Sequence, residues 1–241
     1  MTIQGIWEIF STKMLIEGAV MTLKLTALSE ALSIVFGFFL ALMKTGKNKF
    51  LSKIIDVYIW LFRGLPLILV LIFVYNVFPQ WGIKLTVFQS AVFSLVLNET
   101  AYMVEIMRSG LTSVDAGQKR AAKVLGLSNV QVLYYIVLPQ AIRVLIPPIG
   151  NNLIGMLKTS SMASVISCGD LMRRANQIAA SNFRYAETLI AAGIYYLFFS
   201  AVLAWVLRMV ENHFDIQVAR NKRRKKEEEN EISNHSCKEY K

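Results

Sequence analysis

The sequence has few of the residues on which soluble enzymes depend. Charged residues make up only 17% of its 241 residues, whereas an average soluble domain carries about 25%. Its two cysteines, Cys168 and Cys237, lack the spacing of a zinc site or a disulfide framework. The two histidines, His213 and His235, cannot supply a catalytic triad or a metal cluster. We therefore expect no enzyme activity and no cofactor.

Apolar residues, in contrast, are abundant and occur in long runs. They make up 55% of the chain, and the mean hydropathy is +0.46. Five segments are long enough to cross a hydrocarbon core, which takes about 20 residues each. The predicted spans are residues 19–43, 54–78, 86–107, 143–166 and 188–207. The sequence therefore predicts an all-α polytopic membrane protein with five transmembrane helices between residues 19 and 210.

The first four of these spans contain charged residues. They include Lys24, Glu30, Asp56, Arg63, Glu99 and Lys158. A membrane helix that tolerates such side chains usually turns them toward a bundle interior or a wet cavity. This pattern favours a transporter over a simple anchor. Glu30 in particular is expected to lie buried in the bundle, facing a polar partner.

The two ends of the chain differ in character from the spans. Residues 1–18 carry Ile3, Ile6, Trp7 and Phe10 at helical spacing, which predicts an amphipathic helix at the membrane surface. They lack the basic start of a signal peptide. Residues 211–241 hold a basic run followed by an acidic run. We predict that they form a disordered, solvated tail. The alternative is that the basic run contacts anionic lipid.

The formal net charge of +10 is compatible with two classes of partner, a nucleic acid or a membrane that follows the positive-inside rule. The second is favoured because the basic residues cluster between apolar segments. The regions after spans one, three and five hold 18 Lys and Arg residues, against 5 on the other side. We therefore expect no nucleic acid, an N-terminus outside the cell and a C-terminus in the cytoplasm.

The longest predicted cytoplasmic loop, residues 109–142, has its own internal pattern. Two short helices are expected, 118–125 and 130–137, separated by Gly126, Leu127 and Ser128. Gly126 suits a helix C-terminus, where a positive φ costs little only for glycine. Ser128 is a suitable N-cap, and Pro139 ends the second helix or starts the next element. The pattern predicts that the two helices and the turn form a compact knob that fits a groove on a partner protein. The alternative is an ordinary pair of loop helices.

The same loop carries a recognisable motif. It reads Arg120-Ala121-Ala122, three residues, Gly126, nine residues, and Ile136-Val137-Leu138-Pro139. It resembles the cytoplasmic coupling loop of ABC-importer permeases, whose pattern is Glu-Ala-Ala, three residues, Gly, nine residues, Ile-x-Leu-Pro.

Further blocks resemble one branch of that family, the polar amino-acid permeases of the histidine, glutamine, arginine and cystine type (ABC transmembrane type-1). They occur in the family's order at residues 18, 22–23, 63–67, 101–102, 105–110, 117–118, 138–141, 147–151 and 158–162. The resemblance covers about residues 15–210. Four positions depart from the family pattern: Arg120 replaces an acid, Thr159 an Asp, Met162 a Leu, and Glu99 a small polar residue.

The resemblance implies a binding-protein-dependent importer in the bacterial inner or plasma membrane. The permease would pair with a second copy or a paralogue, with two ATPase subunits that hydrolyse ATP, and with an extracytoplasmic substrate-binding protein. It would take up a polar amino acid. The residues that the motif assigns to ATPase coupling are Gln118, Arg120, Ala121, Ala122, Leu125, Gly126, Leu138 and Pro139, with Leu125, Leu127 and Leu138 anchoring the knob.

An amino-acid zwitterion needs a site for its carboxylate and a site for its ammonium group. Arg63 could hold the carboxylate, and Glu99 could accept the ammonium or a cationic side chain. The full set of candidate substrate-binding residues is Arg63, Asn98, Glu99, Lys158, Thr159, Ser160 and Ser161. The alternative is structural, with Arg63 at the interface, Glu99 paired with Lys158, and the other residues bonding helix to helix.

Two further local features lead to structural expectations. Glu105 and Arg108 are three residues apart and are expected to pair on one helix face. Pro147 and Pro148 remove two backbone donors and are expected to kink or break the fourth span. Two other classes of function stay open from the residues: a membrane-embedded assembly protein without a transport path, and an ion-gradient transporter, which more often shows inverted repeats.

Overall fold

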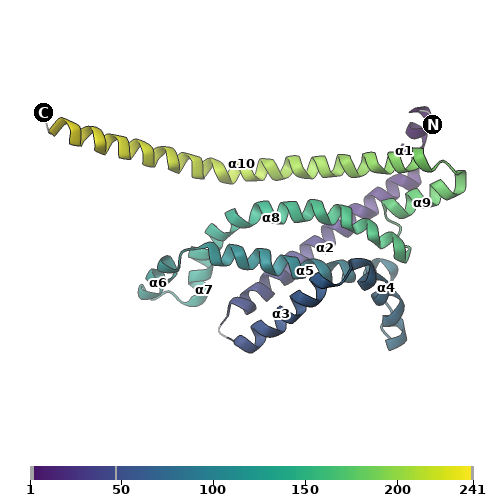
Figure 1. The fold of residues 1–241 in the computed structure, drawn as a ribbon, viewed down its shortest axis with the longest axis horizontal. Coiled ribbons are helices and arrows are strands. Elements are labelled where there is room, and N and C mark those ends of the chain that lie inside the picture. The colour runs from purple at the N-terminus through teal and green to yellow at the C-terminus, as the bar shows by residue number, and fades with distance from the viewer. Residues whose placement is uncertain (1–2, 47, 240–241) are drawn as a thin grey trace.

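The computed structural model describes the backbone of residues 3–46 and 48–239, and the side chains of residues 5–46 and 48–214. Within these residues the chain is 89% helical and contains no strand, as the sequence predicted. The elements are α1 (Ile3–Phe10), α2 (Lys13–Thr45), α3 (Lys49–Gly64), α4 (Leu67–Val77), η1 (Phe78–Trp81), α5 (Val87–Ser113), α6 (Ala116–Val124), α7 (Asn129–Gln131), η2 (Val132–Val137), α8 (Leu138–Thr159), η3 (Ser160–Ile166), α9 (Leu171–Asn182) and α10 (Tyr185–Glu239), shown in Figure 1.

Three helical stretches of the described chain are long and apolar enough to cross a membrane. They are Lys13–Thr45, Asn129–Ile166 and Tyr185–Phe214, which contain the predicted first, fourth and fifth spans. Helix α5 covers the predicted third span but is not among them, because Asn98 and Glu99 lower the hydropathy at its centre. Pro147 and Pro148 lie inside α8, and the helix continues through them, so the fourth span is not broken there; a kink at this point stays a prediction.

The predicted second span, 54–78, is not one straight helix. It is divided into α3 and α4, which are bent by 100° relative to each other at a break of a few residues. The bend has a local cause at Gly64-Leu65-Pro66. Leu65 is extended, with φ −84° and ψ 137°, because a residue before proline avoids the helical region. Pro66 also lacks the N–H that would continue the helical hydrogen bonds.

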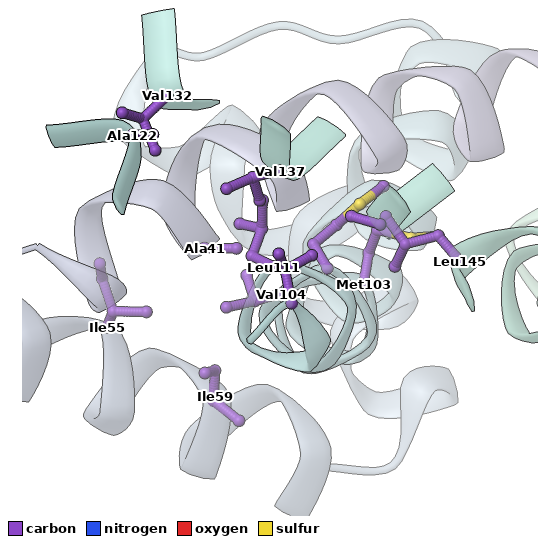
Figure 2. Close-up of a cluster of buried hydrophobic side chains, with 13 residues drawn as sticks. Ala41, Ile55, Ile59, Met103, Val104, Leu111, Ala122, Val132, Val137 and Leu145 are labelled. Atoms are coloured by element: carbon purple, nitrogen blue, oxygen red, sulfur yellow. The ribbon is translucent and has the colours of Figure 1, made fainter. Parts of the chain in front are cut away.

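Helices α2 and α5 pack closely along the middle of the bundle (Figure 1). Their approach depends on a small residue, since a Cβ added at Gly37 would lie 2.5 Å from the Met103 Cγ atom. Met103 belongs to a buried cluster together with Ala41, Val104, Leu111 and Leu145. Figure 2 shows these side chains gathered around α5. Glycine at position 37 therefore allows the contact on which this cluster is built.

The N-terminal segment is divided as well, because α1 ends at Phe10 and α2 already begins at Lys13. The Tyr195 hydroxyl of α10 donates a hydrogen bond to the Phe10 carbonyl at 3.0 Å, and the two rings stack with their centroids 4.3 Å apart. Ile9 is buried in this contact region, whereas Trp7 is 69% exposed. One face of α1 therefore packs on α10, and the expected amphipathic helix at the membrane surface stays a prediction.

Helix α10 continues to Glu239, whereas the sequence predicted a disordered tail from residue 211. In Figure 1 its C-terminal part projects beyond the bundle. The difference follows from composition. The many Lys, Arg and Glu residues of this segment led to the prediction of disorder, but these residue types are also strong helix formers.

Candidate functional site

One face of α2 places polar side chains in the interior of the bundle. Thr22, Thr26, Ser29 and Ser33 follow each other at intervals of four, three and four residues, so they share a helix face. Each is at most 3% exposed. The Thr26 hydroxyl donates to Thr22 O at 2.8 Å and lies 3.5 Å from the Ser160 hydroxyl oxygen. This row, together with Glu30, is called the α2 polar row below.

Two buried carboxylates belong to α2 and α5, the helices that pack closely together here. Glu30 of α2 is 3% exposed and Glu99 of α5 is 8% exposed. The Asn152 amide of α8 donates a hydrogen bond to the Glu99 carboxylate. The alternative pairing of Glu99 with Lys158 is not found among the described residues, where Lys158 is exposed.

Asn98 and Arg63 lie at the junction between α3 and α5. The Asn98 amide donates to Phe62 O at 2.8 Å, so this side chain fixes the end of α3 shortly before the bend. Arg63 is exposed, with its guanidinium carbon 4.9 Å from the centre of the Tyr102 ring. Arg63 therefore makes a cation–π contact and is not brought against Glu99.

The predicted 158–161 block lies where α8 passes into η3. Ser160 is fully buried, and its hydroxyl donates to Leu157 O at 2.8 Å. The Ser161 hydroxyl donates to Lys158 O at 2.7 Å. Thr159 is half-buried. Of the predicted substrate-binding residues, Glu99 and Ser160 thus reach the α2 polar row, whereas Arg63 and Lys158 lie on exposed surfaces.

The loop predicted at 109–142 has the expected local geometry. Asp115 caps α6 by accepting hydrogen bonds from Gly117 N and Gln118 N. Gly126 has φ +83°, a conformation that costs little only for glycine. Ser128 and Gln131 then form a capping box at the start of α7. The chain therefore turns sharply between α6 and α7, as the motif predicted.

The tip of this turn exposes apolar side chains. Val124 is 87% exposed, Leu125 80% and Val130 73%. Leu125 is the C-cap of α6 and points away from the packed face, so its role as an anchor of the knob and in ATPase coupling stays a prediction. Leu127 and Leu138 are partly buried against the main cluster. Contiguous exposed apolar residues mark an interaction surface.

The opposite face of the turn is fixed to the bundle. Ala122 and Val132 are both 5% exposed and lie beside each other (Figure 2). The Gln140 amide donates to the Gln118 side-chain oxygen at 2.8 Å. Arg120, Ala121 and Pro139 remain exposed. Pro139 stands at the beginning of α8, directly after the π-helical turn η2, and so starts the next element.

An ion-pair network joins three helices near this loop. The Lys44 ammonium of α2 lies 2.7 Å from an Asp56 carboxylate oxygen of α3 and 2.5 Å from a Glu105 carboxylate oxygen of α5. Glu105 also pairs with Arg108 at 2.8 Å, as predicted. Each carboxylate thus has a cation, and the network ties the α2–α3 hairpin to the helix that leads into the loop.

At the far end of α2, Asp170 caps α9 and is fully buried. Its carboxylate accepts hydrogen bonds from Met172 N at 3.2 Å and Arg173 N at 3.3 Å. Burial nevertheless raises the pKa of Asp170 to about 6, because the charged form loses its hydration. Gly18 of α2 packs against this region, with a built Cβ only 2.9 Å from Leu171 Cα.

The α2 polar row was not assigned to a site from the sequence, although burial of Glu30 was expected. A signal was present, because small hydroxyl residues recur at 22, 26, 29 and 33 within an otherwise apolar run. Such a stripe alone is also compatible with close helix packing. Only the tertiary structure shows that it faces Glu99 and Ser160.

Comparison with known proteins agrees with this arrangement. The family described as "Binding-protein-dependent transport system inner membrane component" matches residues 33–216. The arginine transport system permease protein ArtQ of Bacillus subtilis is 38% identical over 198 residues, covering 82% of this chain and 90% of that protein. The glutamine transport system permease protein GlnP of Escherichia coli is 33% identical over 214 residues, covering 88% and 97%.

Solved structures agree with the sequence matches. A crystal structure of an amino acid ABC transporter with histidines superposes with a TM-score of 0.80 at 36% identity, covering 88% of this chain and 100% of that chain. The MetNI methionine ABC transporter shares the fold, with a TM-score of 0.70 at 17% identity over 89% and 99% of the two chains. The chain is therefore a member of the family of binding-protein-dependent transport system inner membrane components.

Proposed function

We propose that this chain is the permease subunit of an ATP-driven ABC importer for polar amino acids. The observation that carries the proposal is the exposed apolar tip at Val124 and Leu125, held on a glycine turn that is fixed to the bundle by Ala122. Family membership supplies the kind of partner, because relatives named as amino-acid transport permeases match over most of their length.

In this proposal the α6–α7 turn docks into a separate ATPase subunit. ATP hydrolysis in the partner moves the turn, and the ion-pair network around Lys44 and Glu105 carries the movement to α2, α3 and α5. When helices that are held together at one end move apart at the other, the path between them opens to one side of the membrane at a time, which is alternating access. Arg120 lies exposed beside the tip, so its positive charge faces the ATPase in place of the usual acid.

The substrate path runs along the α2 polar row, between α2, α5 and α8. Glu99, Asn152 and Ser160 line it and supply both charge and neutral hydrogen-bonding groups. Asn98 and Thr159 precede Glu99 and Ser160 in the sequence, and Asn98 donates to Phe62 O of α3. Arg63 and Lys158 are exposed in this conformation and lie at the edges of the path.

We further propose five spans, with the bent α3–α4 pair as the second and α5 as the third. The bent pair is apolar enough to count as one broken span. We propose that the α6–α7 turn and the C-terminus face the cytoplasm and that the N-terminus lies outside, which the excess of Lys and Arg on the side of the turn supports. Two permease chains, as a homodimer or a heterodimer, complete the path together with an extracytoplasmic binding protein.

A co-purification experiment tests the docking of the turn. The tagged chain is expressed with an ATPase of the same transport system, as wild type, as Gly126→Trp and as Gly82→Trp. Gly82 is a matched control, because it also has a positive φ, +80°, and open space around its Cβ position, but lies between η1 and α5. We expect the wild type and Gly82→Trp to retain the ATPase and Gly126→Trp to lose it. Retention by Gly126→Trp would contradict the proposal.

A further inference from the structure

A cavity of about 590 Å³ lies at the end of the bundle opposite the α6–α7 turn, where α9 packs beside the first part of α2 (Figure 1). Its volume is within the usual range of small-molecule sites, about 300–1,000 Å³. Three cationic side chains line it, Lys13 and Lys24 of α2 and Arg174 of α9, together with the Glu17 carboxylate. Three positive charges against one negative charge leave the described lining with an excess of positive charge. The cavity is therefore complementary to an anionic group.

The two lysines lie on one face of α2. Lys13 and Lys24 are eleven residues apart, which is about three helical turns, so their side chains leave the helix in the same direction at points about 16 Å apart along its axis. Both are exposed, and neither ammonium group belongs to the ion pairs found among the described residues. The charges of the two lysines are therefore available to a ligand.

Arg174 forms the facing wall of the cavity and approaches α2 closely. Its carbon stem packs against Gly18, where an added Cβ would lie 2.8 Å from the Arg174 Cγ atom. Its Nη1 donates to the Gln177 side-chain oxygen at 3.2 Å, whereas its Nε is buried without an acceptor among the described residues. A buried donor without an acceptor is unfavourable, and the Gln177 amide is neutral. An anionic ligand would supply the charge that the Arg174 guanidinium lacks.

The apolar part of the lining indicates the kind of anion. Ile16 and Val20, each 45% exposed, lie between the two lysines along α2 and line the same cavity. Lys24 belongs to a helix that is long and apolar enough to cross a membrane, and a lysine in such a helix extends its ammonium group toward the membrane surface. A soluble acidic protein would leave the apolar residues uncovered. A phospholipid supplies a phosphate for the cations and acyl chains for Ile16 and Val20.

We propose that this cavity binds the phosphodiester headgroup of an anionic phospholipid. The phosphate accepts charge-assisted hydrogen bonds from Lys24 and Arg174, Lys13 adds positive charge at the aqueous end, and Glu17 accepts a hydrogen bond from a headgroup hydroxyl. The site goes beyond the proposed function, because it lies outside the proposed substrate path. It also accounts for cations on the side that we propose to be extracytoplasmic, where Lys and Arg are few.

Native mass spectrometry of the whole chain, purified in detergent, measures lipid binding without any need for an ATPase. Dioleoylphosphatidylglycerol is titrated against dioleoylphosphatidylcholine, which has the same acyl chains and no net charge. The proteins compared are the wild type, Lys24→Gln, Lys13→Gln/Lys24→Gln, the charge-retaining Lys24→Arg, and Lys84→Gln. Lys84 is the matched control, because it is an exposed lysine in the loop before α5 and does not line the cavity.

We expect the wild type, Lys24→Arg and Lys84→Gln to bind phosphatidylglycerol at least about tenfold more tightly than phosphatidylcholine. Lys24→Gln should weaken phosphatidylglycerol binding by about fivefold, and the double variant by about twentyfold, because each lysine near an anionic headgroup contributes a similar amount. All three lysines are exposed, so the variants should keep the melting temperature of the wild type.

Equal binding of the two lipids by the wild type, or unchanged phosphatidylglycerol binding by the double variant, would overturn the inference. Inorganic phosphate that displaces the lipid at an equal concentration would also overturn it and assign the cavity to a free anion. A double variant that keeps the lipid but no longer associates with the extracytoplasmic binding protein would assign the cavity to a protein surface instead. The importer function fails separately, through a chain that forms no complex with an ATPase.

Discussion

The α6–α7 turn and the α2 polar row both depart from the usual distribution of side chains, in which apolar residues are buried and polar residues are exposed. The turn exposes Val124 and Leu125, apolar side chains that a protein usually buries. The polar row buries Glu30 and Ser33, polar side chains that a protein usually exposes. Both inversions cost stability in the isolated chain.

The difference between the two regions indicates what each one binds. Exposed apolar residues on a rigid turn are complementary to the surface of a protein partner. Buried polar residues between helices are complementary to a small polar molecule. A substitution in the turn should therefore reduce association with the partner and leave the fold intact, whereas a substitution in the interior should affect packing or substrate.

The largest effect on partner binding is expected at the exposed tip. Leu125→Asp places a charge on the surface that we propose to be covered by the ATPase, and recovery of the ATPase in a pull-down should fall by about tenfold or more, corresponding to at least about 1.4 kcal/mol. The melting temperature of the chain should stay the same, because Leu125 is 80% exposed. Ile83→Asp, at a 46% exposed position in another loop, is the control. Equal recovery from both variants would show that the tip is not a docking surface.

The interior gives the opposite outcome at Gly37. Gly37→Leu forces a side chain into Met103, which a Cβ alone would approach to 2.5 Å, and we expect a loss of about 3 kcal/mol in unfolding free energy. Thermal unfolding in detergent measures it. Gly155→Ala in α8 is the control, because nothing lies within 4 Å of its added Cβ. If Gly37→Leu melts like Gly155→Ala, the close approach of α2 and α5 is not required.

A smaller effect is expected from the pH dependence of Asp170, which lies outside the spans. Its pKa in the folded chain, about 6, is above its ordinary value of 3.8. The folded state therefore holds a proton that the unfolded state releases, so this contribution to stability is full below about pH 4 and is lost as the pH rises through 6. Asp170→Asn keeps a cap and cannot ionise.

For Asp170→Asn we therefore expect a melting temperature close to that of the wild type at pH 4 and higher than it at pH 7, equivalent to about 2 kcal/mol. Thermal unfolding across this pH range, with Asp115→Asn as a capping control at an exposed position, is the measurement. Parallel curves for wild type and Asp170→Asn would show that Asp170 does not titrate in this range.

The smallest effect on stability is expected in the ion-pair network around Lys44, where more than one cation compensates the carboxylates. Lys44→Met removes the cation shared by Asp56 and Glu105 but leaves Arg108 with Glu105. Because Asp56 is 53% exposed, solvent screens much of the interaction, and we expect a loss of about 1 kcal/mol. Thermal unfolding measures it, with the exposed Lys53→Met as the control. No difference between these two variants would remove the network from the proposed coupling route.

The two regions also differ in how far the sequence predicts them. The turn could be predicted in detail, since Gly126, Ser128 and Pro139 act through local backbone chemistry within a few residues. The bend at Gly64-Leu65-Pro66 had an equally local signal, but the length and hydropathy of 54–78 favoured a single span. The exposure of Leu125 could not be predicted, because a helical pattern shows spacing and does not show which face meets the bundle.

The interior depends on contacts between distant parts of the chain. Glu30 and Glu99 are each visible as charges in apolar runs, yet the burial of both follows from how α2 and α5 pack in the bundle. The position of Arg63 against Tyr102 likewise follows from the packing of α3 on α5. Such placements require the tertiary structure, because no sequence spacing relates residues on separate helices.

Reconstituted transport tests the central claim most directly. The chain is placed in proteoliposomes with its ATPase and binding protein, and uptake of a labelled polar amino acid is followed with and without ATP. We predict uptake that requires ATP in the wild type and in Gly82→Trp, and no uptake in Gly126→Trp. Uptake that persists without ATP, or that continues in Gly126→Trp, would contradict an importer driven through the α6–α7 turn.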